Sequence, residues 1–193
     1  HIAISKGVAR AMSKYGRINY SKINIIPNPV ITDNMFTQSS VLVNHSFFGL
    51  KEPLILFVGR LSHEKDLANL IYAFKIVQEK ITSRLIIVGD GPDRDKLEKL
   101  VNKESLNEKV SFLGHKNNPY PYFARSDLFV LSSTREGLPT VIIEALAFGL
   151  KIVSTDCQSG PSEILNNGKY GKLVKQGDSS ALSKSMILSL KEP

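Results

Sequence analysis

The hydrophobic pattern from position 54 onward alternates between short apolar runs and longer segments with helical spacing. Strands are predicted at the apolar runs 54–59, 84–89, 109–114, 127–132, 151–155 and 172–174. Helices are predicted over 66–80, 93–101, 137–149 and 179–190, and a short segment at 122–124 separates two of the strands. Continuous apolar strands separated by helices are typical of a parallel sheet buried on both faces. The chain therefore predicts an α/β fold with a doubly wound parallel sheet.

The first 44 residues follow a different pattern. An apolar stripe and a basic face recur at helical spacing, formed by Ile4, Val8, Ala11, Met12 and Tyr15 and by Lys6, Arg10, Lys14 and Arg17. This predicts an amphipathic helix. Pro27 and Pro29 then stop a short β-branched run, and the polar stretch 32–44 reads as a connection between two bodies. We expect residues 1–20 to be the trailing helix of a preceding domain, with its linker, and residues 21–193 to form the main domain.

Ligands of a doubly wound sheet bind beyond the carboxyl ends of its strands. The segments after the predicted strands read "GRLSHEK" (59–65), "GDGP" (89–92), "GHKNNP" (114–119), "STREGLP" (133–139) and "TDCQSGPSE" (155–163). Gly59 permits a tight turn, and Arg60 and Lys65 have the charge to neutralise a diphosphate, arginine in a bidentate manner. These segments predict a polar binding rim.

The segment "EGLPTVIIEALAFG" (136–149) carries the sharpest signal. Pro139 suits the first turn of a helix, whose unpaired N–H groups over 137–140 would bind phosphate. Glu136 precedes this helix, and Glu144 lies about one turn inside it. Carboxylates accept hydrogen bonds from vicinal hydroxyls, and an unpartnered buried carboxylate would cost several kcal/mol. We therefore expect Glu136 and Glu144 to hold sugar hydroxyls.

These segments, in this order, resemble the donor-binding half of retaining glycosyltransferases of family 4. The resemblance runs from "INIIPNPV" to the last helix and implies a Rossmann-like, C-terminal domain of the GT-B fold. It implies a nucleotide-diphosphate sugar as donor, linked to UDP or GDP, and no metal or other cofactor. The acceptor, a glycan or a lipid-linked saccharide, would bind to an N-terminal domain, without which this chain would be inactive. The pathway implied is polysaccharide or glycoconjugate biosynthesis.

The resemblance also assigns roles to single residues. Arg60 and Lys65 would grip the diphosphate and stabilise the leaving group, and Glu136 would contact the donor sugar. Residues near Gly114 and His115 would contact the nucleobase, Gly137, Leu138 and Pro139 would lie against sugar and phosphate, and Glu144 would hold the ribose. Gly59 and Thr140 are the remaining donor-binding positions. Glu163 matches a further motif of the same rim.

Two positions depart from the family pattern. Asp66 stands where the family often has glycine after the lysine, which places a carboxylate near the phosphates. Ser159 replaces the first of two common glycines, so that loop should be less permissive.

Composition and charge restrict the class of protein, its partners and its cellular compartment. A hydrophobic content of 42% and a charged content of 22% are those of a globular protein, and the net charge of +7 favours anionic partners. The absence of an initial Met suggests an excised fragment, and no segment resembles a signal peptide or a membrane span. The single cysteine, Cys157, fits a reducing compartment, so we expect a cytoplasmic protein. The basic face of the first helix is either a solvated surface or a contact with the inner face of the cytoplasmic membrane.

The sequence leaves three classes of function. The first is the nucleotide-sugar half of a glycosyltransferase, and the second is a non-catalytic nucleotide- or phosphate-binding module. A nucleic-acid binder is disfavoured because the basic residues are not interleaved with aromatic ones. Asp93 and Asp95 form an Asp-x-Asp pattern, which is interpreted as the start of a helix and not as a metal site.

Overall fold

The structure is a computed structural model that describes residues 1–192 of the chain. Its centre is a six-stranded sheet of order β5-β4-β3-β6-β7-β8, in which all neighbours pair in parallel. The strands are β3 (Leu54–Val58), β4 (Arg84–Val88), β5 (Val110–Phe112), β6 (Leu128–Leu131), β7 (Lys151–Thr155) and β8 (Lys172–Val174). The predicted doubly wound parallel sheet is therefore confirmed.

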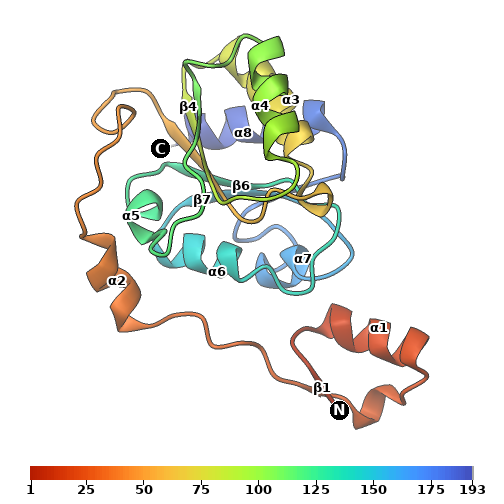
Figure 1. Cartoon of the computed structure of the whole chain (residues 1–193). Helices are drawn as coiled ribbons and strands as arrows, with labels where there is room; N and C mark the ends of the chain where they lie inside the picture. The colour runs from red at the N-terminus through yellow and green to blue at the C-terminus, as the bar shows by residue number, and fades with distance from the viewer. Residues whose placement is uncertain (193) are drawn as a thin grey trace.

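Helices cover both faces of this sheet (Figure 1). One face carries α3 (Leu67–Gln78), α4 (Arg94–Lys103) and α8 (Ser179–Lys191), and the other carries α5 (Tyr120–Phe123), α6 (Thr140–Ala147) and α7 (Pro161–Ile164). The last helix, α8, crosses back over the sheet to pack against α3. Sandwiching between two helical layers explains why the strands are apolar throughout and do not alternate.

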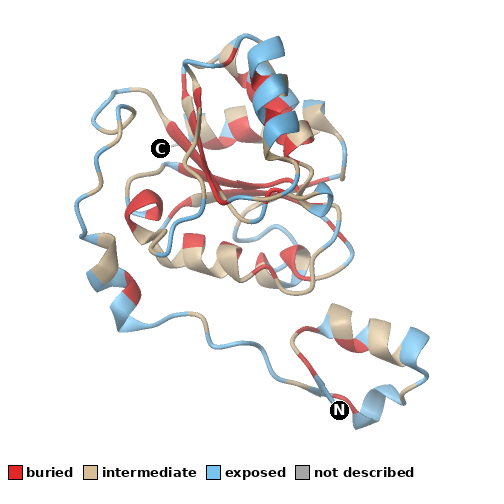
Figure 2. Ribbon diagram, in the orientation of Figure 1, coloured by how far each residue is buried: buried red, intermediate tan, exposed pale blue. Residues whose placement is uncertain are grey.

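The central strands form the buried core (Figure 2). Ile55, Leu56 and Phe57 of β3 are all 0% exposed, so successive side chains on both faces of the sheet are covered. On the α5 and α6 side, Phe123 stacks on Phe129 with ring centroids 5.9 Å apart. The core therefore runs continuously through the sheet and fixes where each strand ends.

The strand order places a topological switch point between β3 and β6. The chain starts at β3, builds β4 and β5 to one side, and then crosses to β6, β7 and β8 on the other side. The loops that leave β3 and β6 therefore run in opposite directions from neighbouring carboxyl ends. Such a reversal opens a crevice in which doubly wound proteins bind ligands.

A small separate unit precedes the main domain. Its elements are β1 (Ile2–Ala3), α1 (Lys6–Gly16), the short 3-10 helix η1 (Tyr20–Lys22) and β2 (Asn24–Ile25). The two strands pair in parallel, and Ala3, Ala9 and Ile23 form a core of their own. The unit therefore ends at residue 25, beyond the boundary predicted at residue 20, because β2 pairs with β1. Tyr15, expected in the apolar stripe, is 69% exposed.

The connection to the main domain contains a helix that the sequence pattern does not predict. This helix, α2 (Asp33–Ser39), lies within the stretch that was expected to be an irregular polar connection. Met35 is buried, and the ring of Phe36 lies 5.3 Å from that of Phe148 at the end of α6. The helix also packs against α5. Tertiary contacts therefore stabilise α2, whereas its own sequence is mostly polar.

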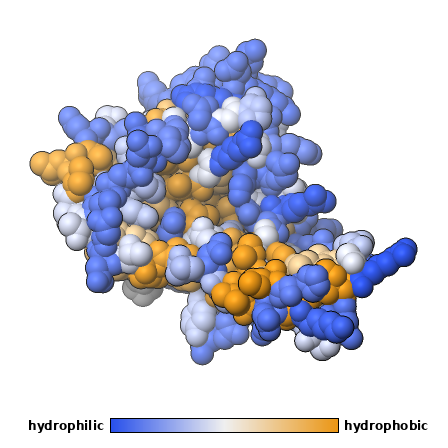
Figure 3. Space-filling view, turned by 60° about the horizontal axis from the view of Figure 1, so that its bottom comes forward, coloured by the Kyte–Doolittle hydropathy of each residue, from blue (hydrophilic) through white to orange (hydrophobic). Residues whose placement is uncertain are grey.

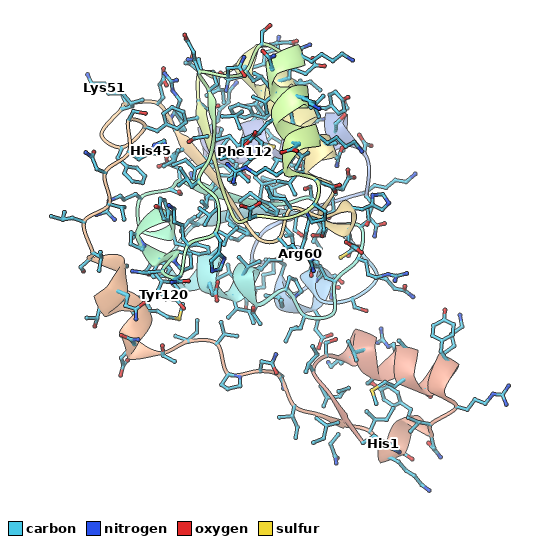
Figure 4. All side chains as sticks on the ribbon, viewed as in Figure 1. His1, His45, Lys51, Arg60, Phe112 and Tyr120 are labelled. Carbon is cyan, nitrogen blue, oxygen red and sulfur yellow. The ribbon has the colours of Figure 1, made fainter. Side chains whose placement is uncertain are left out.

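The end of the connection is tied to the edge of the sheet near His45 and Phe112 (Figure 4). The Nε2 atom of His45 lies 3.0 Å from Ser111 Oγ, and the backbone N–H of Phe47 donates to His45 Nδ1 at 3.1 Å. Nδ1 is therefore the unprotonated nitrogen, and Nε2 donates to the serine. The guanidinium of Arg84 sits 5.0 Å from the centre of the Phe47 ring.

Exposed apolar side chains concentrate in the first 50 residues. Ile2, Ile26, Val41 and Leu42 are 63%, 54%, 50% and 91% exposed. A band of hydrophobic residues, bordered by hydrophilic ones, crosses the face shown in Figure 3. None of the helices within residues 1–192 has both the length and the hydrophobicity needed to cross a bilayer.

We predict that His45 makes stability depend on pH in the mildly acidic range. Burial lowers the pKa of His45 below its ordinary value of 6.5, and protonation of Nδ1 would break the bond from Phe47. The unfolded chain binds the proton more readily, so stability should fall as pH drops through 6.5. Because solvent screens this partly exposed ring, we expect a loss of at most about 1 kcal/mol between pH 7.5 and 5.5. Urea unfolding of the chain and of His45→Asn measures it, and equal pH dependence in both would contradict the prediction.

Candidate functional site

Lys65 and Glu136 meet across the switch point. Lys65 ends the short 3-10 helix η2 (His63–Lys65) after β3, and Glu136 lies in the loop after β6. Lys65 Nζ donates to Glu136 Oε1 at 2.5 Å, and Ser133 Oγ donates to the same oxygen at 2.6 Å. Their side chains are only 21% and 10% exposed. The structure thus brings together two residues that the sequence assigned to the donor diphosphate and the donor sugar.

The backbones of the same two loops are also joined. Ser132 Oγ donates to the carbonyl oxygen of Lys65 at 2.7 Å, and the N–H of Thr134 donates to the carbonyl of Glu64 at 2.8 Å. Both bonds lie directly beyond the ends of β3 and β6. These bonds hold the two loops together, so the fold itself brings Lys65 and Glu136 into contact.

Asp66 adopts a left-handed backbone conformation immediately after this lysine. Its φ is 44° and its ψ is 51°, a region that glycine enters without strain and Asp tolerates. Its carboxylate accepts from the N–H of Asn69 at 3.4 Å and caps α3. The carboxylate is thus directed to the start of α3.

A hollow of about 390 Å³ opens beyond the ends of β3, β4 and β5. Gly59, Arg60, Asp90, His115, Lys116 and Pro119 are among the residues that line it. Backbones approach closely here, because a Cβ on Gly89 would lie 1.9 Å from the carbonyl oxygen of Gly59. The N–H of Gly89 donates to Gly114 at 2.9 Å, which joins the two loops. Arg60, Gly59 and His115 therefore share one hollow, and Gly114 shapes it.

Charged side chains brace one wall of this hollow. The carboxylate of Asp90 accepts from the N–H of Gly91 at 2.7 Å and from Arg94 Nη1 at 3.1 Å. Arg94 also donates to Glu98 at 2.8 Å. Arg60 and Lys116 are exposed and form no ion pair within residues 1–192. The hollow thus presents cations to a ligand, while its acidic group is occupied.

The loop from Glu136 to Pro139, called the donor loop here, leads into α6. Pro139 was expected inside the first turn, but α6 begins at Thr140 and Pro139 is the residue before it. The extended ψ of 87° at Pro139 explains the difference. The first N–H groups of α6 still lack partners within the helix, as at every helix start. Leu138 and Thr140 flank this turn and are partly exposed.

Glu144 is partly buried on α6 among apolar neighbours. Burial raises its pKa above the ordinary value, and within residues 1–192 its carboxylate forms no hydrogen bond or ion pair. The pKa of Tyr120 is raised first by its burial and then by the charge of Glu144, so the two groups are close. Tyr120 follows Pro119, a lining residue of the hollow, and lies on the side of the sheet covered by α6 (Figure 4). Glu144 is therefore a partly buried carboxylate without a hydrogen-bond or ion-pair partner in the part of the chain that the structure describes.

Cys157 lies beside the site and is buried. Its burial and the charge of Glu136 raise the pKa of the thiol to about 11. Such a thiol is protonated at neutral pH and is a poor nucleophile.

The Asp-x-Asp pattern lies at a helix start, as the sequence indicated. Asp93 is the N-cap residue of α4 and Asp95 lies in its first turn. Within residues 1–192, no group of three or more His, Cys, Asp or Glu side chains is arranged to hold a metal ion.

Several polar residues of the site were not singled out from the sequence. Ser132 and Ser133 anchor Lys65 and Glu136, Asp90 and Lys116 line the hollow, and Tyr120 lies near Glu144. Ser132 ends a predicted strand, and Ser133, Asp90 and Lys116 lie within two residues after one, which is the signal that would have found them. Tyr120 belongs to a short helix and gives no such signal.

Glu163 does not face the hollow. Both of its carboxylate oxygens accept from the backbone N–H of Lys6, at 3.1 and 3.0 Å. The rim motif that contains it is therefore engaged with the N-terminal unit in this structure.

Comparison with known proteins shows the family. The family described as "Glycosyl transferases group 1" matches residues 41–193, which is most of the chain. The chain belongs to this family of glycosyltransferases.

Relatives agree with this assignment. An uncharacterized glycosyltransferase of Methanocaldococcus jannaschii is 37% identical in an alignment of 171 residues that covers 80% of this chain and 42% of that protein. The N-acetylgalactosamine-N,N'-diacetylbacillosaminyl-diphospho-undecaprenol 4-alpha-N-acetylgalactosaminyltransferase of Campylobacter jejuni is 32% identical over 188 residues, covering 97% of this chain and 50% of the enzyme. The chain thus spans about half the length, or less, of these relatives.

A solved structure agrees in fold. HepE of Anabaena in complex with UDP superposes with a TM-score of 0.80 at 23% identity, over 97% of this chain and 52% of that one. The fold is that of a GT-B glycosyltransferase domain, as the sequence predicted.

We predict that Glu144→Gln stabilises the ligand-free chain at neutral pH. The pKa of Glu144 is raised, so its ionised form is disfavoured in the folded state, and this penalty appears as pH rises through the folded pKa. Removing the charge should raise the free energy of unfolding by about 0.5–1 kcal/mol at pH 7.5, and by less at pH 4.5. The gain is this small because solvent screens the partly exposed carboxylate. Thermal unfolding at both pH values measures the gain. Glu108→Gln, at an exposed position, is the control, and equal effects of the two variants would refute the prediction.

Proposed function

We propose that this chain is the donor-binding domain of a retaining glycosyltransferase that transfers a sugar from a UDP-sugar to a glycan or lipid-linked acceptor. The main support for this proposal is the contact between Lys65 and Glu136 at the switch point of the sheet, next to the start of α6. The acceptor would bind to a further domain, of which residues 1–25 are the last part, and the chain alone would not turn over.

The charges of the site match the charges of the reaction. Glycosyl transfer builds negative charge on the departing diphosphate, and fixed cations and helix N–H groups stabilise such charge. Arg60 and Lys65 would supply the cations, and the first N–H groups of α6 would complete the cradle. These groups act without a metal ion or another cofactor.

The two glutamates would then take different hydroxyls. When a diphosphate draws Lys65 toward itself, Glu136 would be released in part and would accept from hydroxyls of the donor sugar. Glu144 would bind the ribose hydroxyls, because its carboxylate has no other partner and lies near the hollow. The nucleobase would occupy the hollow between Gly59, Gly114 and His115.

Relatives motivate the choice of nucleotide and acceptor. The HepE structure contains UDP, and the Campylobacter relative is named for a diphospho-undecaprenol acceptor. Lys116 at the hollow offers a donor to the carbonyl oxygens of uracil, whereas the carboxylate that guanine would use, that of Asp90, is already paired. We therefore favour a UDP-linked donor over a GDP-linked one.

Lys65→Ala should weaken UDP binding by about 10- to 100-fold, because a charge-assisted contact contributes about 1.5–3 kcal/mol. Isothermal titration of the chain with UDP, GDP and a single-stranded oligonucleotide measures this. Lys80→Ala, which removes an exposed lysine remote from the site, is the matched control. Equal binding of UDP to both variants, or binding of the oligonucleotide alone, would overturn the proposal. Turnover of a UDP-sugar by a protein with both halves then distinguishes an enzyme from a binding module.

The basic face of α1 gives a reason to expect an acceptor that is held at a membrane. Lys6, Arg10, Lys14 and Arg17 are all exposed, and Lys6 and Arg10 also line a hollow between α1 and α7. Lys14 and Arg17 lie toward the other end of the helix, beside the exposed ring of Tyr15. We propose that this end approaches an anionic membrane that carries the lipid-linked acceptor.

Vesicle binding tests the membrane contact. The chain should bind vesicles with 30–40% phosphatidylserine more tightly than neutral ones, since each basic residue near such a surface contributes about 1 kcal/mol. Lys14→Glu should reduce this binding about fivefold or more, whereas Lys80→Glu should change it less. Equal binding to neutral and anionic vesicles would exclude the contact.

A further inference from the structure

The N-terminal unit touches the main domain at the donor loop itself. Ser5 is 0% exposed, and its hydroxyl donates to the carbonyl oxygen of Gly137 at 3.0 Å. The same hydroxyl oxygen accepts from the N–H of Val8 at 3.1 Å and so caps α1. One side chain therefore joins the start of α1 to the second residue of the donor loop.

Glu163 makes a second contact with the start of α1. Its two oxygens accept from the N–H of Lys6, the first residue of the helix. This N–H has no partner within α1, and a carboxylate at a helix N-terminus is favoured by the helix dipole. Glu163 thus provides the hydrogen-bond acceptor for the first N–H group of a helix that lies 157 residues away in the sequence.

The approach between the two parts leaves no room for side chains at two glycines. A Cβ on Gly7 would lie 2.4 Å from Ser159 Oγ. A Cβ on Gly160, whose φ is +94°, would lie 2.3 Å from Pro139 Cδ. The start of α1, the 159–160 loop and the donor loop are therefore stacked in direct contact. A displacement of α1 would therefore move the donor loop in two ways. One is the hydrogen bond from Ser5 to Gly137, and the other is the packing of Gly7 on Ser159 and of Gly160 on Pro139.

We propose that Ser5 and Glu163 are positioning residues that hold the donor loop in the conformation that binds the nucleotide sugar. The inference rests on the proposed function for its consequence, because only a donor bound at this loop would sense the docking. It assigns to Glu163 a role toward the N-terminal unit, whereas the sequence motif placed this residue only on the ligand-binding rim. Since coupling is reciprocal, a donor on the loop would also strengthen docking of the unit.

The experiment uses the full 193-residue chain and four variants. Ser5→Ala removes both bonds of the hydroxyl. Ser5→Asp keeps an acceptor that can cap α1 but cannot donate to Gly137. Glu163→Ala breaks the second contact from the other side, and Glu108→Ala is the control at an exposed position. Backbone ¹⁵N relaxation of Gly137 and Leu138 is measured without ligand, and UDP is then titrated. Unchanged chemical shifts in β3 and β4 show that a variant is folded.

We expect the order parameters of Gly137 and Leu138 to fall from about 0.85 toward 0.6 in Ser5→Ala, Ser5→Asp and Glu163→Ala, and not in Glu108→Ala. The dissociation constant for UDP should rise about 3- to 10-fold in the same three variants, as the loss of a hydrogen bond implies. Unchanged order parameters would overturn the inference. A mobile loop with unchanged UDP affinity would overturn the positioning role. If the unmodified chain does not bind UDP, the proposed function fails, while the relaxation data still decide whether the unit holds the loop.

Discussion

The ion pair of Lys65 with Glu136 is the contact around which the site is organised. It joins two loops that are 71 residues apart in the chain and leave adjacent strands at the point where the winding of the sheet reverses. Both side chains are mostly buried, and a buried charge without a partner is strongly unfavourable. The pair satisfies both charges within the protein. Under the proposed function, a diphosphate that binds the lysine would also free the glutamate for the donor sugar.

Two kinds of residue build the surroundings of this pair. Glycines such as Gly89 and Gly160 let backbones meet where no side chain fits, and this brings loops from separate strands within bonding distance. Polar residues then fix the loops, with Ser132 and Ser133 on the side of Lys65 and Glu136. Glu144 differs from all of these because it is held among apolar neighbours with its carboxylate unpaired. Burial disfavours the ionised form of this carboxylate.

Much of the fold could be read from the sequence because each central strand is buried on both faces. That burial leaves a continuous apolar run inside each segment, which can be recognised without knowledge of its neighbours. The helix α2 and the pairing of β2 with β1 leave no such local mark, since Phe36 needs Phe148 and Asn24 needs Ile2. The same limit applies to the site. The rim positions Arg60, Lys65 and Glu136 follow from strand ends, whereas the partners of Ser5 and Glu163 depend on how two separately folded parts meet.

Asp66 shows that one backbone requirement can be met by two chemically different residues. The left-handed turn after Lys65 is open to glycine because glycine lacks a Cβ, and to aspartate because its carboxylate binds the following helix. What must be kept at this position is a dihedral angle and not a residue type. Motif searches that require glycine after the lysine would therefore pass over chains such as this one, and a search that admits Asp and Asn there would recover them.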